Sequence, residues 1–259
     1  MKEPSQNDLL FAKLKDKIKF CNSKNKITHT DFYTEPELLK IEKFLDLSNI
    51  KNYFTFGGYE EASRKMVFFY PDKLTYEMAF SNVSQVLKII RITLSNSQHE
   101  TFEHRDYLSA IMKFGIVREK FGDIVVYPEG ADFIVQLENA EYFKNSLQDL
   151  IRFRKANFEI LDINKLHEIN QELEEISIIV NSMRIDNFVS EICRCSRNKA
   201  EEILLQERVM INYEAITKNS KAVNINDIIT IRGFGRFIVK EISRKTKSNK
   251  NVIILIHNK

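Results

Sequence analysis

Hydrophobic positions in the first third of the chain follow two helical stretches and then two short strands. Residues 5–20 and 34–47 carry apolar side chains at spacings of three and four, which predicts amphipathic helices. The apolar runs 53–56 and 66–70 lie on either side of a Gly-Gly turn and predict strands. We therefore expect residues 1–82 to form a small N-terminal α/β domain.

The middle third alternates between strand-like and helix-like patterns in the order βαββαβ. The expected elements cover residues 87–94, 103–114, 123–127, 131–137, 140–155 and 158–163. This is the ferredoxin-like order, which RNA-recognition (RRM-like) modules share with many unrelated domains. Residues 83–164 are therefore expected to form a ferredoxin-like, RRM-like domain whose sheet face either binds RNA or only packs. The Glu-rich residues 165–181 predict an acidic helical connector.

The last third, residues 182–259, predicts two short helices followed by strands. Ser182 and Ser196 stand where the two helices are expected to begin. Strands are expected over 209–212, 227–232 and 236–239, with a Gly-Phe-Gly turn between the last two. The fold class is therefore α+β, in three small domains joined in series.

Charge is distributed unevenly along the chain. The net formal charge is +3, but residues 1–179 carry −4 and residues 180–259 carry +7. Phosphate attraction supplies most non-specific affinity for nucleic acids, so a basic module attached to a near-neutral body is typical of an RNA- or DNA-binding appendage. A merely solvated basic face is the alternative interpretation.

Composition excludes several classes of protein. With 43% hydrophobic residues and only 7 Gly and 4 Pro, the chain is neither disordered nor collagen-like. The longest apolar runs, such as Val252–Ile256, are far shorter than the roughly 20 residues of a membrane-spanning helix. The N-terminus has no apolar signal region, and the three cysteines fit a reducing compartment, so we expect a cytoplasmic protein without membrane contact.

Four motifs in the last third resemble the S-four RNA-binding domain, named after ribosomal small-subunit protein four. They are Arg184-Ile185-Asp186, Ser196-Arg197-Asn198-Lys199-Ala200, Arg208-Val209-Met210-Ile211-Asn212 and Asn226-Asp227-Ile228-Ile229. The resemblance covers about sixty residues. Glu207 and Asn226 replace two glycines of the pattern, and we expect slightly altered turns there rather than a lost domain.

The expected RNA contacts follow from the basic and polar positions of these motifs and of the turn after them. They are Arg184, Arg197, Asn198, Lys199, Arg208, Asn212, Arg232 and Arg236. Several lie at helix starts, where backbone N–H groups add donors for phosphate. Arg105, Arg118 and Lys120 of the middle domain are expected as secondary contacts, with helix capping and surface charge as the alternative.

Four longer motifs make the chain similar to the YlmH-type bacterial proteins. They are Gly57–Arg64, His104–Ala110, Gly115–Ile124 and Arg232–Phe237. The resemblance implies a ribosome-associated protein that binds ribosomal and transfer RNA on a large subunit with an obstructed peptidyl-tRNA. It also implies a part in ribosome quality control, with quality-control factors as partners, and an association with cell-division genes.

Enzyme motifs are not found in the sequence. His104-Arg105-Asp106 is followed by Ile111 where a kinase loop needs Asn, and no Walker loop or paired zinc-ligand set is present. We expect a monomeric, non-enzymatic protein without catalytic residues, metal, cofactor or small-molecule substrate. Two alternatives stay open: an RNA-modifying enzyme that docks as S-four pseudouridine synthases do, with its active site in residues 27–163, and a cell-division adaptor.

Overall fold

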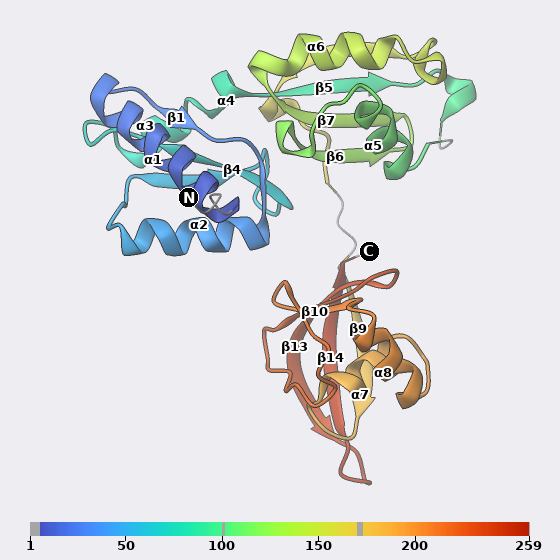
Figure 1. Ribbon diagram of the computed structural model, residues 1–259. Coiled ribbons are helices and arrows are strands. Elements are labelled where there is room, and N and C mark those ends of the chain that lie inside the picture. Colours follow the sequence, from blue (N-terminus) through green and yellow to red (C-terminus); the bar gives the residue numbers. More distant parts are fainter. Residues whose placement is uncertain (1–5, 100–101, 170–172, 259) are drawn as a thin grey trace. The chain divides into compact units, whose positions relative to one another are not determined.

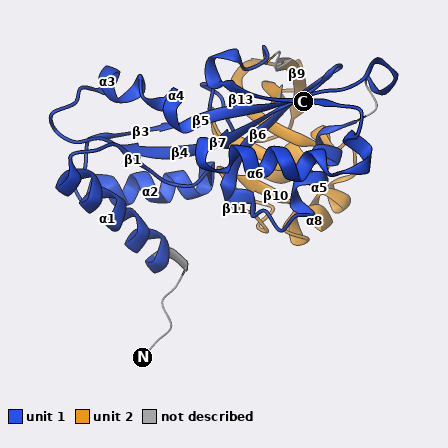
Figure 2. Ribbon diagram, turned by 90° about the horizontal axis from the view of Figure 1, so that it is seen from above, with its two compact units in different colours: residues 1–168 blue, residues 169–259 orange. Residues whose placement is uncertain are grey.

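The computed structural model describes residues 6–99, 102–169 and 173–258, which form two compact units (Figure 1). Unit 1 comprises residues 1–168 and unit 2 comprises residues 169–259 (Figure 2). The N-terminal and ferredoxin-like parts of the chain are therefore joined in one unit. None of the helices in the described ranges has the length and apolar character of a membrane span.

The N-terminal part of unit 1 is a small sheet with helices on both faces. Its elements are α1 (Gln6–Lys24), β1 (Thr28–His29), β2 (Tyr33–Thr34), α2 (Glu35–Leu47), β3 (Tyr53–Phe56), β4 (Arg64–Phe69), α3 (Tyr76–Phe80) and α4 (Val83–Val86). Strand β4 is central and pairs antiparallel with the other three. Thr34 caps helix α2: the Glu37 carboxylate accepts hydrogen bonds from the Thr34 backbone N–H and hydroxyl, both at 2.7 Å.

The ferredoxin-like part has the expected βαββαβ order. Its elements are β5 (Leu87–Thr93), α5 (His104–Met112), β6 (Phe121–Tyr127), β7 (Gly130–Gln136), α6 (Leu137–Gln148) and β8 (Asn157–Asp162). The antiparallel strands lie in the order β6-β7-β5-β8, and α5 and α6 pack on one face of the sheet. The expected second helix, 140–155, is too long, because α6 ends at Gln148. Residues 151–153 form a separate 3₁₀ turn, which places Phe153 in the core against Tyr107.

The N-terminal part packs against the other face of this sheet at β7. All seven residues of β7 are buried, although only every second side chain can face the helices. On the opposite side, Ile134 shares a core with Phe32 and Phe54, and the Gln136 amide donates to the Thr30 carbonyl at 3.0 Å. Of the two roles left open for the sheet face, the structure shows packing at β7.

Two of the long sequence motifs meet at this junction. The Asp123 carboxylate accepts hydrogen bonds from the Tyr59 hydroxyl at 2.8 Å and from the Ser63 backbone N–H at 2.6 Å. Gly58 adopts φ +108°, and a Cβ there would lie 2.8 Å from the Ile134 methyl. The junction therefore requires a residue without a side chain at position 58, and these motifs hold the two parts of unit 1 together.

A second buried carboxylate secures the end of unit 1. Asp132 is fully buried and accepts two hydrogen bonds from Arg91, at 2.8 and 2.7 Å. It also accepts from the Tyr127 hydroxyl at 3.1 Å and from the His167 backbone N–H at 2.9 Å. A buried charge needs such partners, and this one attaches the segment after β8 to the sheet.

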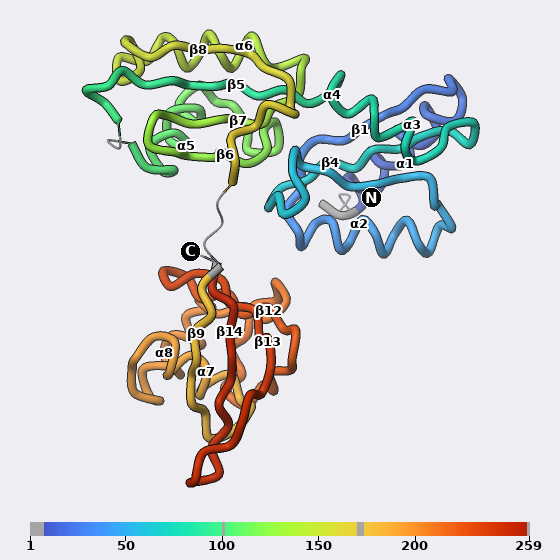
Figure 3. Tube along the Cα trace, turned by 180° about the vertical axis from the view of Figure 1, so that it is seen from behind, coloured from blue at the N-terminus to red at the C-terminus, as the bar shows by residue number. Residues whose placement is uncertain are grey.

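Unit 2 has two helices packed on a six-stranded antiparallel sheet. Its elements are β9 (Leu173–Val180), α7 (Ile185–Ile192), α8 (Arg197–Leu205), β10 (Val209–Ile211), β11 (Glu214–Ala215), β12 (Ile228–Ile231), β13 (Gly235–Lys245) and β14 (Asn251–Asn258). The strand order is β11-β10-β12-β13-β14-β9, and Figure 3 shows β14 beside β9.

The expected acidic helical connector at residues 165–181 is wrong where the structure describes it. Residues 173–180 form β9, which pairs with β14 and belongs to unit 2, and residues 170–172 lie outside the described residues. The reason lies in the period of the pattern. Ile178 and Val180 are buried while Ile179 is half exposed, which is the alternation of a strand and not of a helix.

The two turns with replaced glycines keep a glycine-like backbone. Glu207 has φ 54° and Asn226 has φ 70°, both in the left-handed region. Asn tolerates this region better than Glu, because its short amide can bond locally. The substitutions therefore retain the turns, at a cost that falls mainly on Glu207.

Replacing Ile134 by Ala is expected to lower the free energy of unfolding of unit 1 by about 2–5 kcal/mol, because the side chain is fully buried between its two parts. Urea denaturation of the full chain measures this change. Ile242→Ala, at a 42% exposed position in unit 2, is the control and should change stability by less than about 0.5 kcal/mol. Equal effects of both substitutions would contradict the shared core.

Replacing Glu207 by Gly is expected to raise the free energy of unfolding of unit 2 by about 0.5–1 kcal/mol. Relief of left-handed strain, about 1–2 kcal/mol, exceeds the entropic cost of glycine, about 0.5–1 kcal/mol. Hydrogen exchange of the β10 and β12 amides measures this locally. A smaller gain is expected for Asn226→Gly, and a loss of protection in Glu207→Gly would show that the turn is not strained.

Candidate nucleic-acid interface

Arg184 is held at the start of α7 by a buried carboxylate. Its Nε and one terminal nitrogen donate to the two oxygens of Asp186, both at 3.0 Å. The Asp186 side chain is 5% exposed and that of Arg184 is 44% exposed. This contact raises the pKa of Arg184, which keeps the guanidinium charged. The edge of the Arg184 guanidinium that faces Asp186 is held in place, and its remaining N–H donors stay available to a phosphate.

Helix α8 begins beside the start of α7. Ser196 caps it by accepting a hydrogen bond from the Lys199 backbone N–H at 3.3 Å. The Arg197 guanidinium donates to the Asn187 side chain of α7, so two of the expected contacts, Arg184 and Arg197, stand on neighbouring helix starts. Asn198 is exposed beside them. These features make an anion-binding arrangement of side chains and helix N-termini.

Lys199 and a loop extend this basic surface. The Lys199 ammonium pairs with Glu202 at 2.7 Å, with both side chains more than half exposed, so the pair is weak and can open. The backbone carbonyl of Lys221 accepts from the Ile185 N–H at 2.9 Å, which places the loop of Lys218 and Lys221 at the start of α7. Both lysines are exposed, and the sequence analysis missed them because no motif or helical pattern marks that loop.

Arg208 and Arg232 form a second group at the turn between β12 and β13. A terminal nitrogen of Arg208 donates to the Arg232 backbone carbonyl at 2.9 Å, while the Arg232 residue is exposed. Gly233 has φ +91° in this turn. Arg236 is half-buried, with its guanidinium carbon 5.4 Å from the centre of the Tyr213 ring. The structure thus brings the expected contacts together as two groups.

Asn212 has a structural role in this arrangement. Its amide donates to Asp227 at 2.8 Å, and its side-chain oxygen accepts from the Ile228 N–H at 2.9 Å. It also adopts φ 49°, in the left-handed region. Both ends of the side chain are engaged, so Asn212 holds two turns of the domain together.

The three expected secondary contacts lie in unit 1. Arg105 pairs with Glu103 at 3.2 Å on an open surface. One terminal nitrogen of Arg118 donates to the carbonyls of Phe121 and Gly122 at 2.8 and 2.9 Å, and burial, together with the nearby Arg64, lowers the pKa of Arg118 to about 10. Lys120 pairs with Asp31 at 2.8 Å across the junction of the two parts. Arg118 and Lys120 thus have structural partners within the fold.

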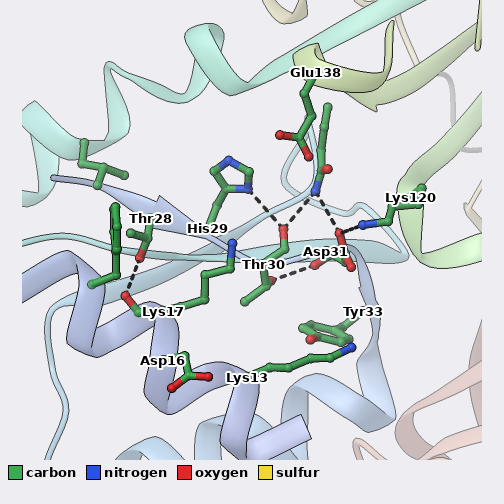
Figure 4. A pocket seen from close by; sticks show the side chains of 13 residues that line it. Lys13, Asp16, Lys17, Thr28, His29, Thr30, Asp31, Tyr33, Lys120 and Glu138 are labelled. Carbon is green, nitrogen blue, oxygen red and sulfur yellow. Dashed lines mark hydrogen bonds and ion pairs between the residues drawn. The ribbon is translucent and has the colours of Figure 1, made fainter. Parts of the chain in front are cut away.

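A cleft of about 640 Å³ opens in unit 1 between α1, the segment around β1 and the start of α6 (Figure 4). Its charges balance: Lys13, Lys17, Lys120, Asp16, Asp31 and Glu138 line it. Thr28 and Thr30 donate their hydroxyls to the backbone carbonyls of Lys17 and Asp31, at 3.0 and 2.7 Å. His29 likewise donates to the Thr30 carbonyl, so neither threonine hydroxyl donates to His29 as a nucleophile would to its base.

Asn212→Ala is expected to lower the free energy of unfolding of unit 2 by about 1–3 kcal/mol, because the buried Asp227 loses a donor and the Ile228 N–H loses its acceptor. The salt dependence of RNA binding should stay that of the unaltered protein. Urea denaturation and fluorescence anisotropy with an RNA stem–loop measure the two quantities. A loss of affinity without a loss of stability would make Asn212 a direct RNA contact.

Comparisons with known proteins agree with this arrangement. Residues 84–179 match the family model of the RNA-binding domain in YlmH, and residues 183–229 match the S4 (S-four) domain. The chain is 27% identical over 226 residues to ribosome-associated protein quality control protein P2 of Bacillus subtilis (strain 168), covering 85% of this chain and 83% of that relative.

A solved structure of cell division protein ylmH from Streptococcus pneumoniae is similar over 64% of this chain and 99% of that chain. The identity is 20% and the TM-score is 0.46. The two family matches identify the domains of this chain, and the basic starts of α7 and α8 lie within the S-four match. The chain therefore carries a YlmH-type RNA-binding domain followed by an S-four domain in its last third.

Proposed function

We propose that this protein is a cytoplasmic RNA-binding factor that associates with the large ribosomal subunit and peptidyl-tRNA, in ribosome quality control of stalled nascent chains. The observation that carries the proposal is the pair of arginines at the starts of α7 and α8, inside a matched S-four domain. The name of the Bacillus subtilis relative, a ribosome-associated quality control protein, supports the cellular role.

Binding would depend on phosphate contacts held in place beforehand. Arg184 is oriented by Asp186, and Arg197 by Asn187, so little side-chain freedom is lost when RNA binds. A rigid pair of guanidinium groups beside two helix N-termini suits the backbone of a structured RNA, which proteins recognise mainly by shape and by phosphate and 2′-hydroxyl contacts. The proposed targets are ribosomal RNA and transfer RNA.

Unit 1 has a different proposed role. The N-terminal part packs on β7, which is buried along its whole length. The motif residues Asp123 and Gly58 lie at the junction of the two parts. We therefore assign direct RNA binding chiefly to unit 2, while unit 1 supplies a rigid body that contacts other parts of the ribosomal complex or its quality-control factors. The protein is proposed to act as a monomer.

The alternatives are less favoured. An RNA-modifying enzyme would need an active site in unit 1, and the cleft there directs its hydroxyls and His29 to backbone carbonyls. Among the described residues, no group of three or more potential metal ligands is found. The acidic connector is the feature that would best serve a cell-division adaptor, but residues 173–180 form strand β9 within the unit 2 sheet instead of a helix.

Changing Arg184, Arg197, Lys199 and Arg208 to Ala is expected to weaken binding to large ribosomal subunits and to flatten its salt dependence. Each lost phosphate contact removes roughly one unit of log–log slope. Sedimentation of the protein with purified large subunits at two KCl concentrations measures both effects. Circular dichroism of the variant checks that unit 2 is folded, since Asp186 loses a buried partner.

The matched control changes Lys40, Lys43, Lys51 and Lys73 to Ala. These four residues are exposed in unit 1 and their loss alters net charge equally. The control should sediment with large subunits as the unaltered protein does. If the two variants bind alike, the assigned face is wrong, and if the unaltered protein does not sediment with large subunits, the ribosomal role is wrong.

A further inference from the structure

A basic hairpin extends from unit 2 outside the S-four match, which ends at residue 229. Strands β13 and β14 form it, and the loop at its end is the red turn at the foot of unit 2 in Figure 3. Arg244, Lys245, Lys247 and Lys250 lie within seven residues that contain no acidic residue. All four are exposed, and none forms an ion pair within the described part of the chain.

The turn of this hairpin has a defined geometry. The Thr246 N–H donates to the Lys250 carbonyl at 2.8 Å, and the Lys250 N–H donates to the Thr246 hydroxyl at 3.1 Å. The Asn249 N–H donates to the Thr246 carbonyl at 2.9 Å, and Asn249 adopts φ 61°. The cations are therefore presented on an ordered turn, so their backbone positions need not be fixed when a ligand binds.

The hairpin is close to the start of α7. Lys245 pairs with Asn251, and Asn251 pairs with Val180, the last residue of β9. Lys245 is thus two strand spacings, about 10 Å, from Val180 at the end of β9. Arg184 lies four residues after Val180 and therefore within about 14 Å of it. Both groups of cations fit within the roughly 16 base pairs that a double-stranded RNA-binding domain spans.

We propose that the β13–β14 hairpin is a second RNA-binding element, in which Arg244, Lys245, Lys247 and Lys250 contact phosphates of the same structured RNA as the helix starts. The inference rests on the proposed RNA binding of unit 2 and extends it to residues outside the S-four motifs. Contacts of this kind follow the backbone and do not depend on base sequence, because ammonium groups act as point charges.

Edge protection is the competing explanation. Strand β13 pairs with β12 over residues 235–238, and Val239 bonds to the backbone of Asn226 and Asp227. Beyond Val239, no strand of the described residues pairs with this edge of β13. Lysines on such edges prevent strands of two molecules from pairing. This explanation predicts that loss of the cations causes self-association and leaves RNA affinity unchanged, whereas the RNA-binding explanation predicts a change in salt dependence.

The test uses a full-length variant with Gln in place of Arg244, Lys245, Lys247 and Lys250. Gln keeps the side chains long while removing the charges. Fluorescence anisotropy measures binding of the full chain to a labelled RNA stem–loop of about 16 base pairs, between about 50 and about 200 mM KCl. The control carries Gln at Lys40, Lys43, Lys51 and Lys73, which gives the same net charge.

The hairpin variant is expected to lose about three to four units of log–log salt slope and at least about tenfold in affinity at the lower salt. The control should keep the slope of the unaltered protein. Equal RNA binding by both variants would overturn the proposal. Unchanged RNA binding would also overturn it if the hairpin variant newly self-associates in sedimentation, which is the edge-protection result. The same holds if RNA binding is unchanged and the hairpin variant instead loses binding to anionic phospholipid vesicles, which would assign the cations to a membrane surface.

Failure of the ribosomal role gives a different pattern. In that case the unaltered protein does not sediment with large subunits, while the stem–loop titration still compares the two variants and decides the hairpin proposal. A variant with Arg at Lys245, Lys247 and Lys250 keeps the charges and should bind as the unaltered protein does. If the unaltered protein binds no stem–loop RNA at all, the hairpin proposal is also wrong.

Discussion

Strand β7 has no face left for solvent. Its outer side chains pack on α5 and α6, while Ile134 and Gln136 on the other side meet Phe32 and Thr30 of the N-terminal part. A sheet that is buried on both faces must be apolar along its length or must provide partners for each polar group, and Asp132 and Gln136 both have them. The junction between the two parts of unit 1 depends on this double burial.

This constraint separates structural from binding residues. Where a sheet face is covered, it cannot stack bases in the way an RNA-recognition module does, and the Gly and Asp residues of the unit 1 motifs serve close packing instead. In unit 2 the polar residues are used differently. Asp186 and Asn187 lie buried and direct two arginines toward solvent at the helix starts.

The cations of unit 2 therefore form two groups that are held in different ways. At the helix starts, buried partners orient a few cations, which favours a defined docking geometry. At the β13–β14 hairpin, Lys and Arg side chains are exposed on an ordered turn, which favours attraction to the phosphate backbone with little geometric demand. Together they provide an oriented contact and a longer-range electrostatic one.

Local patterns in the sequence determined much of this protein: the helix starts at Thr34 and Ser196, the βαββαβ order, and the positive charge of the last third. They were insufficient for β9, because a short stretch with both Glu and Ile fits two periods and only pairing with β14 decides between them. Tertiary structure alone decided which polar residues are structural, because Lys120 and Asn212 acquire their partners, Asp31 and Asp227, only on folding. Hydrogen bonds between distant residues have no signature in a single sequence.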